Sequence, residues 1–348
     1  MESGKSNIKI FVSHRIDIES EVINNPLYIP VRCGAVFDTK NPMNILGDDT
    51  GDNISERRMT FCEFTVQYWA WKNVEADYYG LCHYRRFLSF SDKRFKTDEF
   101  NMIHYPFLTS KEKRQLGLLN EQRMREIITA CDVVTSEYAL VSKIPSPNGR
   151  VHSVRELWEA HDGIFIEKST IDLMFTLIDE LSPEYSRSAR EYFAGGLHRG
   201  FNCFVMRKEL FDRLCRFQFP IMFELENRLD FSGYTQTMKR TPGFVGEMLY
   251  GIFLYHISNY ENWKIHETQL AFFVNADRIK SNTGYQRKRI AYVLDRAARF
   301  LIDPVMPKGT KRRETLKKII FTLTPLKPRG VAVIQEFESI ISASNNNS

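Results

Sequence analysis

Three basic residues, His83, Arg85 and Arg86, follow a short apolar run at residues 78–82. The run has the length and the β-prone composition of a buried strand. The carboxyl end of such a strand is where open α/β sheets bind their ligands. Guanidinium groups stay charged and bind phosphate oxygens in pairs, so the segment, with Tyr84 inside it, indicates a diphosphate site. The alternative is an arginine pair in surface salt bridges.

Strand alternation sets a condition on this site. It predicts that His83 and Arg85 face one side of the sheet, while Tyr84 and Arg86 face the other. The sequence therefore does not require both arginines to contact one ligand.

Glu247 is the only charged residue in a strongly apolar stretch, residues 244–255, which follows a Pro-Gly pair. We expect a largely buried helix that carries Glu247 in its first turn. Burial raises the pKa of an unpaired carboxyl group, which suits a general base. The helix dipole would favour the ionised form. A structural salt bridge with Arg240 is the alternative interpretation.

Other polar candidates lie in loops and at strand ends. His14 and Arg15 follow the first expected strand, where folds of this kind usually receive a nucleotide base and its ribose. His198 and Asn202 flank Gly200 at the entry to a later strand and could contact a donor sugar or an acceptor. An ordinary polar loop would contain the same residues.

Turn-forming residues cluster between residues 47 and 53. The cluster contains Asp48, Asp49, Asp52 and Asn53, which are common in turns for backbone reasons alone. As a functional cluster it would hydrogen-bond the hydroxyl groups of a sugar or a nucleotide. A divalent cation held by Asp49 and Asp52 is a further alternative, although EF-hand spacing is absent.

Strands and helices alternate around these candidates. Thr60 and Glu63 fit a capping box at the start of a helix whose stripe of Phe61, Phe64, Tyr68 and Trp71 is typical of a core face. Strands are expected at residues 8–13, 78–82, 132–135, 201–206 and 269–274, and helices at 121–130, 154–161, 169–181, 209–217, 219–229 and 244–255. The order predicts an α/β domain with a mixed, mainly parallel sheet flanked by helices.

Composition limits the class of protein. The 348 residues are 43% hydrophobic and 13% aromatic, which is enough for a large core. Six cysteines lack CxxC spacing, so we expect free thiols in a reducing compartment. We find neither a signal-peptide core nor an apolar run that could span a membrane, and we expect a cytoplasmic protein. Motifs of NTPases, esterases, zincins and dinucleotide enzymes are absent.

Basic residues concentrate near the C-terminus, where residues 278–329 contain 15 Lys and Arg against 3 Asp and Glu. We therefore divide the chain into a domain at 1–277, a basic helical extension at 278–330 and a terminal segment at 331–348. One helical face carries Ile290, Val293, Leu294, Ala297 and Leu301, and the basic residues Lys311, Arg312, Arg313, Lys317 and Lys318 follow. A basic amphipathic helix can bind an anionic membrane, or it can pack on the domain with its basic face in solvent. Nucleic acid is not an expected partner, because no recognisable binding module is present.

Seven segments carry a family resemblance: FVSHR, YIPVRCGA, GDDTGDNIS, QYWAWKN, ADYYGLCHYRRF, FNCFVMRKELF and GFVGE. With them the chain resembles an uncharacterised family of bacterial glycosyltransferases from capsule, exopolysaccharide and lipopolysaccharide gene clusters. The resemblance implies a GT-A-like fold, a nucleotide-sugar donor and a lipid-linked surface glycan as acceptor, reached at the inner face of the cell membrane. A UDP-hexose is the favoured donor, and family association also allows UDP-galactofuranose.

The resemblance also implies roles for single residues. The segment GFVGE resembles the family's motif, and its carboxylate is that of Glu247, which the resemblance implies is the base of an inverting displacement. GT-A enzymes usually end the strand in question in an acidic DxD pair that holds a divalent cation. This chain has HYRR there, so His83, Arg85 and Arg86 would stabilise the leaving diphosphate, and Mn²⁺ or Mg²⁺ stays an alternative. Two other functions stay open. The absence of the acidic pair is also consistent with a non-catalytic, membrane-associated scaffold, and the arginines could also bind phosphate in a sugar phosphotransferase.

Overall fold

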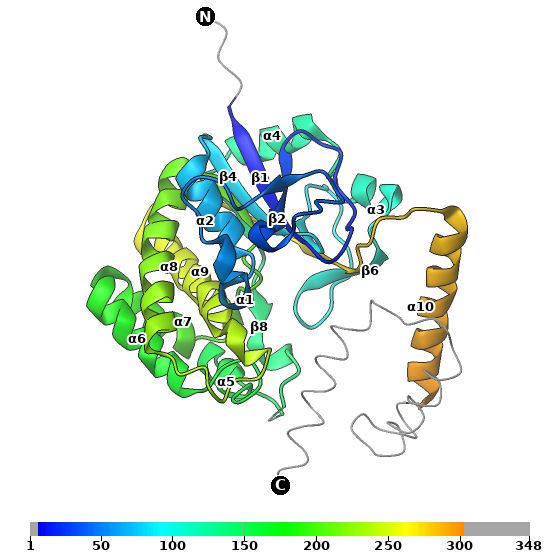
Figure 1. The fold of residues 1–348 in the computed structure, drawn as a ribbon. Helices are drawn as coiled ribbons and strands as arrows, with labels where there is room; N and C mark the ends of the chain where they lie inside the picture. The colour runs from blue at the N-terminus through cyan, green and yellow to red at the C-terminus, as the bar shows by residue number, and fades with distance from the viewer. Residues whose placement is uncertain (1–5, 148, 303–348) are drawn as a thin grey trace, which may run out of the picture. The chain divides into compact units, whose positions relative to one another are not determined.

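The computed structural model describes residues 6–147 and 149–302. The chain divides into one unit that ends at Arg278 and a second unit that begins at Ile279. The first unit is built on a mixed β-sheet with helices packed against it (Figure 1). No helix in the described part of the chain combines the length and the apolar composition needed to cross a membrane.

The strands follow one another through most of the first unit. They are β1 (Ile8–Arg15), β2 (Tyr28–Cys33), β3 (Leu46–Gly47), β4 (Tyr78–His83), β5 (Arg86–Leu88), β6 (Met102–Phe107), β7 (Val133–Ser136), β8 (Ala139–Leu140), β9 (Leu197–His198), β10 (Phe204–Arg207), β11 (Ile265–Thr268) and β12 (Leu270–Asn275). The central order is β11-β7-β10-β4-β1-β2-β3. Only β10 runs antiparallel to its neighbours in this series. The predicted mixed, mainly parallel sheet is confirmed.

A second group of strands continues from the end of β4. The chain turns after β4 into β5, and β12 pairs antiparallel with β5 and parallel with β6. The carboxyl end of β4 therefore stands at the junction between the central sheet and this smaller group.

The helices fill the connections between the strands. They are α1 (Arg58–Phe61), α2 (Phe64–Asn73), α3 (Ser110–Gln115), α4 (Glu121–Thr129), α5 (Val154–Glu159), α6 (Ser169–Leu181), α7 (Ser186–Ala194), α8 (Lys208–Arg228), α9 (Thr241–Tyr260) and α10 (Asn282–Ile302), with the short 3-10 helices η1 (Ala35–Phe37) and η5 (Met238–Arg240) among others. The range predicted for α6 is confirmed residue for residue.

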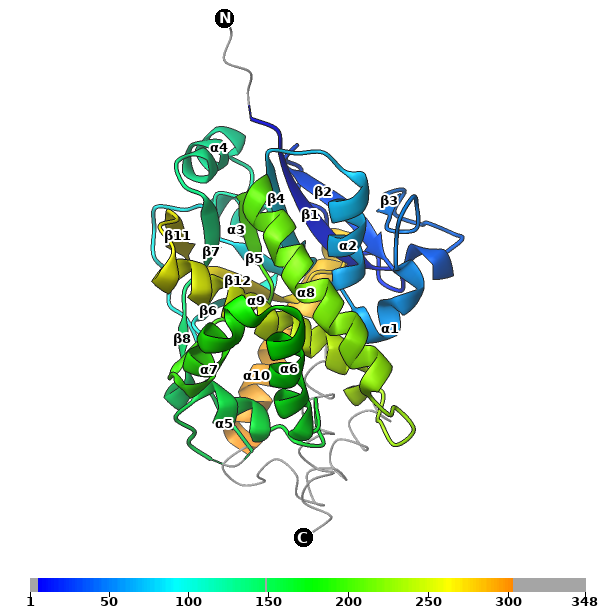
Figure 2. The same cartoon turned by 90° about the vertical axis from the view of Figure 1, so that its left-hand side faces the viewer.

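Strand alternation separates two apolar cores, one on each face of the sheet. In β4, Tyr79 and Leu81 belong to one core, whereas Tyr78 and Cys82 belong to the other. Helices α2 and α6 to α9 cover the first core, and Figure 2 looks onto this layer with α8 in front of the strands. The second core lies under α4 and the group formed by β5, β6 and β12.

The two helices predicted at residues 209–217 and 219–229 form one continuous helix, α8. The prediction of a break at residue 218 is wrong, because α8 continues through Pro220. The proline removes one backbone N–H donor. Phe219 and Ile221 on either side are buried, and burial of this apolar face offsets the lost hydrogen bond.

Two local predictions around the site also fail. The strand predicted from residue 201 begins only at Phe204, because Phe201 and Asn202 adopt left-handed backbone angles with φ of 71° and 36°. The capping box of Thr60 and Glu63 does not form, because the Thr60 hydroxyl donates to Arg57 O at 3.2 Å and the Glu63 side chain caps nothing. In addition, β6, α3 and α7 were not predicted.

Candidate functional site

The candidate site forms at the hairpin between β4 and β5. His83 ends β4 and lies directly opposite Arg86, which begins β5. Directly opposed residues project from the same face of a sheet. The prediction that these two side chains face opposite ways is therefore wrong, because the chain turns at Tyr84 and Arg85 instead of continuing as a strand.

The two guanidinium groups of the hairpin share an aromatic neighbour. Arg85 lies 5.5 Å and Arg86 lies 5.7 Å from the ring centre of Phe272 in β12. Arg86 also lies 4.5 Å from the ring centre of Phe201. Among the described residues, no hydrogen-bond partner reaches the buried Nε of Arg86. Burial of a charged donor without a partner is costly, so this guanidinium is a candidate for an anionic ligand.

Two neutral histidines stand beside the arginines. Burial lowers the pKa of His83 well below its ordinary value, and the neighbouring arginine charges lower it further. His14, at the end of β1, is bonded through Nδ1 to the Ser20 hydroxyl at 2.6 Å, and burial lowers its pKa to about 4. Both histidines therefore offer hydrogen bonds near neutral pH rather than positive charge. Tyr84 is buried in the hairpin, with its ring centre 6.4 Å from that of His14.

Glu247 joins the same cluster from α9. This helix begins at Thr241, earlier than predicted, so Glu247 stands in its second turn, and the prediction of a first-turn dipole partner is wrong. The partly exposed carboxylate accepts a hydrogen bond from the backbone N–H of Phe201. Burial and then the charge of Glu63 raise the pKa of Glu247 to about 7, although nearby arginines and the hydrogen bond oppose them. A carboxyl group with this pKa can accept a proton near neutral pH.

A chain of buried amide groups fixes the backbone around Glu247. Asn202 Nδ2 donates to Gln67 Oε1 at 3.1 Å, and Gln67 Nε2 donates to Gln218 Oε1 at 2.7 Å. Gln218 Nε2 then donates to Gly246 O at 2.8 Å. The chain joins the loop before β10 to the turn of α9 that carries the carboxylate. It connects three helices and a loop through neutral groups only.

Arg240 and Cys62 complete the cluster at the start of α9. Arg240 donates through Nε to Cys62 Sγ at 3.1 Å, and its guanidinium lies 5.4 Å from the ring centre of Phe244. Cys62 separates α1 from α2 with φ of 52°. All six cysteines are free thiols, and the other five are buried. Burial raises the pKa of the Cys62 thiol, and the charge of Arg240 opposes this effect.

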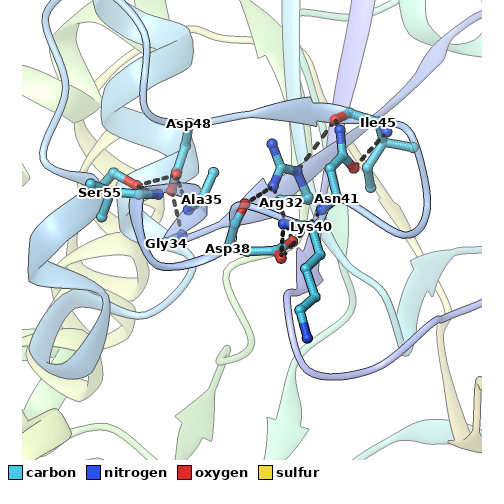
Figure 3. A network of polar contacts seen from close by, with 10 residues as sticks. Arg32, Gly34, Ala35, Asp38, Lys40, Asn41, Ile45, Asp48 and Ser55 are labelled. Carbon is cyan, nitrogen blue, oxygen red and sulfur yellow. Dashed lines mark hydrogen bonds and ion pairs between the residues drawn. The ribbon is translucent and has the colours of Figure 1, made fainter.

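The turn at residues 47–53 holds the fold around the site together. In Figure 3 the Asp48 carboxylate lies against the start of η1, where it accepts hydrogen bonds from the N–H groups of Gly34 and Ala35, each at 2.9 Å. It also accepts from the hydroxyl groups of Ser55 and Thr65, each at 2.5 Å. These four donors explain why a carboxylate can be fully buried at this position.

The other members of the turn lie toward solvent. Asp49 and Asp52 are exposed, and Asp52 accepts a hydrogen bond from the Tyr68 hydroxyl at 3.1 Å. Asn53 donates to Gly51 O at 2.9 Å and so closes its own turn. Three or more His, Cys, Asp or Glu side chains arranged to hold a metal ion are not found in the described part of the chain.

Two further candidates have structural partners. His198 is buried, its Nδ1 lies 3.1 Å from the Tyr192 hydroxyl, and burial lowers its pKa to about 4. Arg15 forms an ion pair with Asp17 in its own loop. The predicted residues that the structure brings together are His14, His83, Tyr84, Arg85, Arg86, Asn202, Arg240 and Glu247.

Sequence reasoning missed three contributors to this cluster. Glu63 was assigned to a helix cap, and Phe201 was placed inside a strand. Gln67 offered a usable signal, because it is a polar residue between Val66 and Tyr68 on a mostly aromatic and apolar stretch of α2, where it is 1% exposed. The signal predicts a buried hydrogen bond but not its partner.

Comparison with known structures agrees with this architecture. The chain is similar to the apo structure of WbbM, a bifunctional glycosyltransferase, with 29% sequence identity and a TM-score of 0.70. The match covers 77% of this chain and 46% of that chain, so this chain spans about half the length of the structure it matches. This likeness confirms the predicted GT-A-like α/β fold.

Comparison of sequences places the chain in a family. No protein with a curated description matches it. The family model described as "Domain of unknown function (DUF4422)" matches residues 9–259. That range contains all but the first residue of β1, the β4–β5 hairpin, the loop before β10 and all but the last residue of α9. The chain therefore belongs to the DUF4422 family.

Proposed function

We propose that the protein is a glycosyltransferase that moves a hexose from a nucleotide-sugar donor to a lipid-linked surface glycan. A UDP-hexose is the donor we favour, with UDP-galactofuranose as one member of that class. One observation carries the proposal: Arg86, whose buried Nε lacks a partner in the described chain, stands beside Glu247, whose pKa is about 7. Glycosyl transfer needs this combination of an anion-binding group and a base. Similarity to a bifunctional glycosyltransferase supports the same reaction class.

In the proposed reaction, the oxygen of an acceptor hydroxyl attacks the anomeric carbon of the donor in a single displacement with inversion. Glu247 takes the hydroxyl proton as the new carbon–oxygen bond forms. The bond between the anomeric carbon and the diphosphate oxygen breaks, and its electron pair leaves with the diphosphate. Arg85 and Arg86 balance the charge that develops there, and the neutral His83 contributes a hydrogen bond.

The remaining candidates have supporting roles in this proposal. His14 lies near His83 at the end of the neighbouring strand, where it can border the nucleotide. Arg240 interacts with the charge of Glu247, and Asn202 follows Phe201, whose backbone N–H binds Glu247, so both can border the transferred sugar. Donor contacts by Arg15, Asp49, Asp52, Asn53 and His198 have no such support, because these residues are exposed or have structural partners.

We also propose that α10 attaches the enzyme to an anionic membrane surface. In its described part, the exposed residues Arg287, Lys288 and Arg289 precede Ile290 and Leu294, whose exposed fractions are 58% and 63%. Basic groups attract anionic lipid headgroups, and apolar side chains can enter the interface between them. A lipid-linked acceptor would then be reached at the inner face of the cell membrane. The predicted basic residues at 311–318 and the segment 331–348 lie outside the described residues.

Calorimetric titration with UDP, first in EDTA and then with Mn²⁺, tests the donor site. We expect binding in EDTA, and we expect Arg86→Ala to raise the Kd about tenfold or more, because a hydrogen bond to a charged group contributes about 1.5–3 kcal/mol. Arg216→Ala is the matched control, because it removes an arginine that pairs with Asp212 on the exposed surface of α8. Glu247→Gln should keep UDP binding and abolish transfer.

Each part of the proposal can fail separately. Equal Kd values for Arg86→Ala and Arg216→Ala would contradict the diphosphate role. Binding that requires Mn²⁺ would redirect the donor site to Asp49 and Asp52. Failure of every nucleotide to bind would favour a scaffold over an enzyme, and unchanged transfer by Glu247→Gln would remove this residue as the base.

A further inference from the structure

Glu63 is a second carboxylate next to Glu247. It occupies the N-cap position of α2, but its side chain makes no capping hydrogen bond there. In the described part of the chain, no hydrogen bond or ion pair holds its carboxylate. Like Glu247, it is partly exposed to solvent. A carboxylate without a structural partner beside the proposed base is a candidate for a role in the reaction.

The close approach of α9 brings Glu63 and Glu247 together. A Cβ atom at Gly246 would lie only 2.5 Å from the Phe64 ring. One at Gly243 would lie 3.2 Å from a carbonyl oxygen of α1. Because neither glycine has a side chain, the backbone of α9 packs directly against the break between α1 and α2. Glu63 precedes Phe64 and Glu247 follows Gly246, so both carboxylates lie at this contact.

Charged and polar groups from several elements face Glu247. They are Arg86 from β5, Arg240 from η5, Cys62 and Glu63 from the break between α1 and α2, and the neutral amide of Gln218 from α8, which acts through Gly246 O. Helix α7 meets α9 farther along, at Gly251, through the uncharged hydroxyl of Tyr192. Glu63 is thus the negative charge that opposes ionisation of Glu247, after burial itself.

We propose that Glu63 is a positioning residue for the reaction: its negative charge repels that of Glu247 and so favours the uptake of a proton by Glu247. The charges of Arg86 and Arg240 act on Glu247 in the opposite direction. This inference rests on the proposed function, in which Glu247 is the base. Without the Glu63 charge, Glu247 would lose its proton at lower pH and would be a weaker base.

The experiment follows the pair itself and then its effect on turnover. In protein labelled with ¹³C at the glutamate carboxyl carbons, an NMR titration follows Glu247, whose signal is assigned by its loss in Glu247→Gln. Glu63→Gln should lower the Glu247 midpoint by about one pH unit. The acid limb of kcat/KM, measured as UDP release from UDP-galactose or UDP-glucose, should move to lower pH by a similar amount. Glu63→Asp keeps the charge and should keep both values near those of the wild type.

Glu56→Gln is the matched control, because Glu56 is an exposed carboxylate of the same segment, 4.0 Å from Arg57. It should leave the Glu247 midpoint unchanged. An unchanged midpoint in Glu63→Gln would overturn the inference. Equal effects of Glu63→Asp and Glu63→Gln would also overturn it, because they would indicate a structural role. A lowered midpoint together with no UDP release by the wild type would support the carboxylate pair and contradict the proposed function instead.

Discussion

Chemical modification of Cys62 can report whether a ligand occupies the candidate site, and it requires no knowledge of the acceptor. It contacts Arg240, and it is the one cysteine that is not buried. Burial raises the pKa of its thiol, so the reactive thiolate forms at alkaline pH. We expect iodoacetamide to modify Cys62 first, at a rate that rises with pH. Saturation of the donor site with UDP at about ten times its Kd should slow the reaction about tenfold.

Mass spectrometry of the peptide that contains Cys62 measures this rate. Arg86→Ala should reduce the protection to about twofold or less at the same UDP concentration, because its Kd is expected to rise about tenfold or more, whereas Arg216→Ala should retain the full protection. Modification of a buried cysteine at the same rate as Cys62 would contradict the arrangement of the site. Equal rates with and without saturating UDP would place the nucleotide elsewhere.

Single residues differ in how far the sequence reveals their roles. Glu247 could be predicted, because a lone carboxylate in an apolar stretch has few structural explanations. Glu63 could not, because its spacing from Thr60 also fits a helix cap. The choice between these roles depends on the left-handed backbone at Cys62, which separates α1 from α2 and has no signal in the residue types. The sequence also did not reveal that His83 and Arg86 lie on the same face, because this arrangement depends on a turn that the residue types do not indicate.

At the scale of elements, Asp48 is the residue that ties the end of β2 to α2. It accepts hydrogen bonds from the backbone of η1 and from the hydroxyl group of Thr65 in α2. Asp48→Asn keeps the shape of the side chain but replaces a charged acceptor with an amide that must face several donors. We expect the free energy of unfolding to fall by about 2–4 kcal/mol, since loss of hydrogen bonds to a buried charge costs this much. Urea denaturation measures the change.

Asp49→Asn is the control for this prediction, because Asp49 neighbours Asp48 in the sequence and is exposed. Its effect on the free energy of unfolding should stay within about 0.5 kcal/mol. Similar losses in both variants would show that the turn, rather than the buried carboxylate, determines stability. No loss in either variant would contradict the role of Asp48 as a buried anchor.

Elements with a clear period were predictable, and elements defined by their neighbours were not. The apolar, β-prone composition that predicted β4 is a property of that strand alone, and the spacing of apolar residues that predicted α6 is a property of one helix. Strand β6 was missed because its residues give no clear alternation, and its place depends on pairing with β12. The start of α9 was placed too late, because Thr241 and Pro242 are helical here despite their low propensity.

At the scale of the whole molecule, the two units have different charge. The chain has a net charge of +5, yet residues 278–329 alone contain 15 Lys and Arg against 3 Asp and Glu. The remainder is therefore acidic overall, which does not favour contact with an anionic membrane through the first unit. The exposed run Arg287, Lys288 and Arg289 in α10 lies in the described part of this basic segment, which also contains the exposed Arg278 and Lys280.

Flotation of the full chain with vesicles tests whether this charge binds a membrane. Each basic residue near an anionic surface contributes roughly 1 kcal/mol, so replacing Arg287, Lys288 and Arg289 with Gln should weaken binding to phosphatidylglycerol-containing vesicles roughly a hundredfold. Binding of the wild type should fall with added salt and should be absent from neutral vesicles.

A second triple variant separates the position of the charges from their number. Arg187, Arg190 and Arg216 are exposed arginines of the first unit, and each pairs with a carboxylate there. Replacing these three with Gln removes the same charge from the chain but leaves α10 intact, so binding to anionic vesicles should weaken far less. Equal losses in the two variants would mean that net charge alone governs attachment. Undiminished binding by the α10 variant would contradict a contact through residues 287–289 and would direct attention to the predicted basic residues at 311–318, which lie outside the described residues.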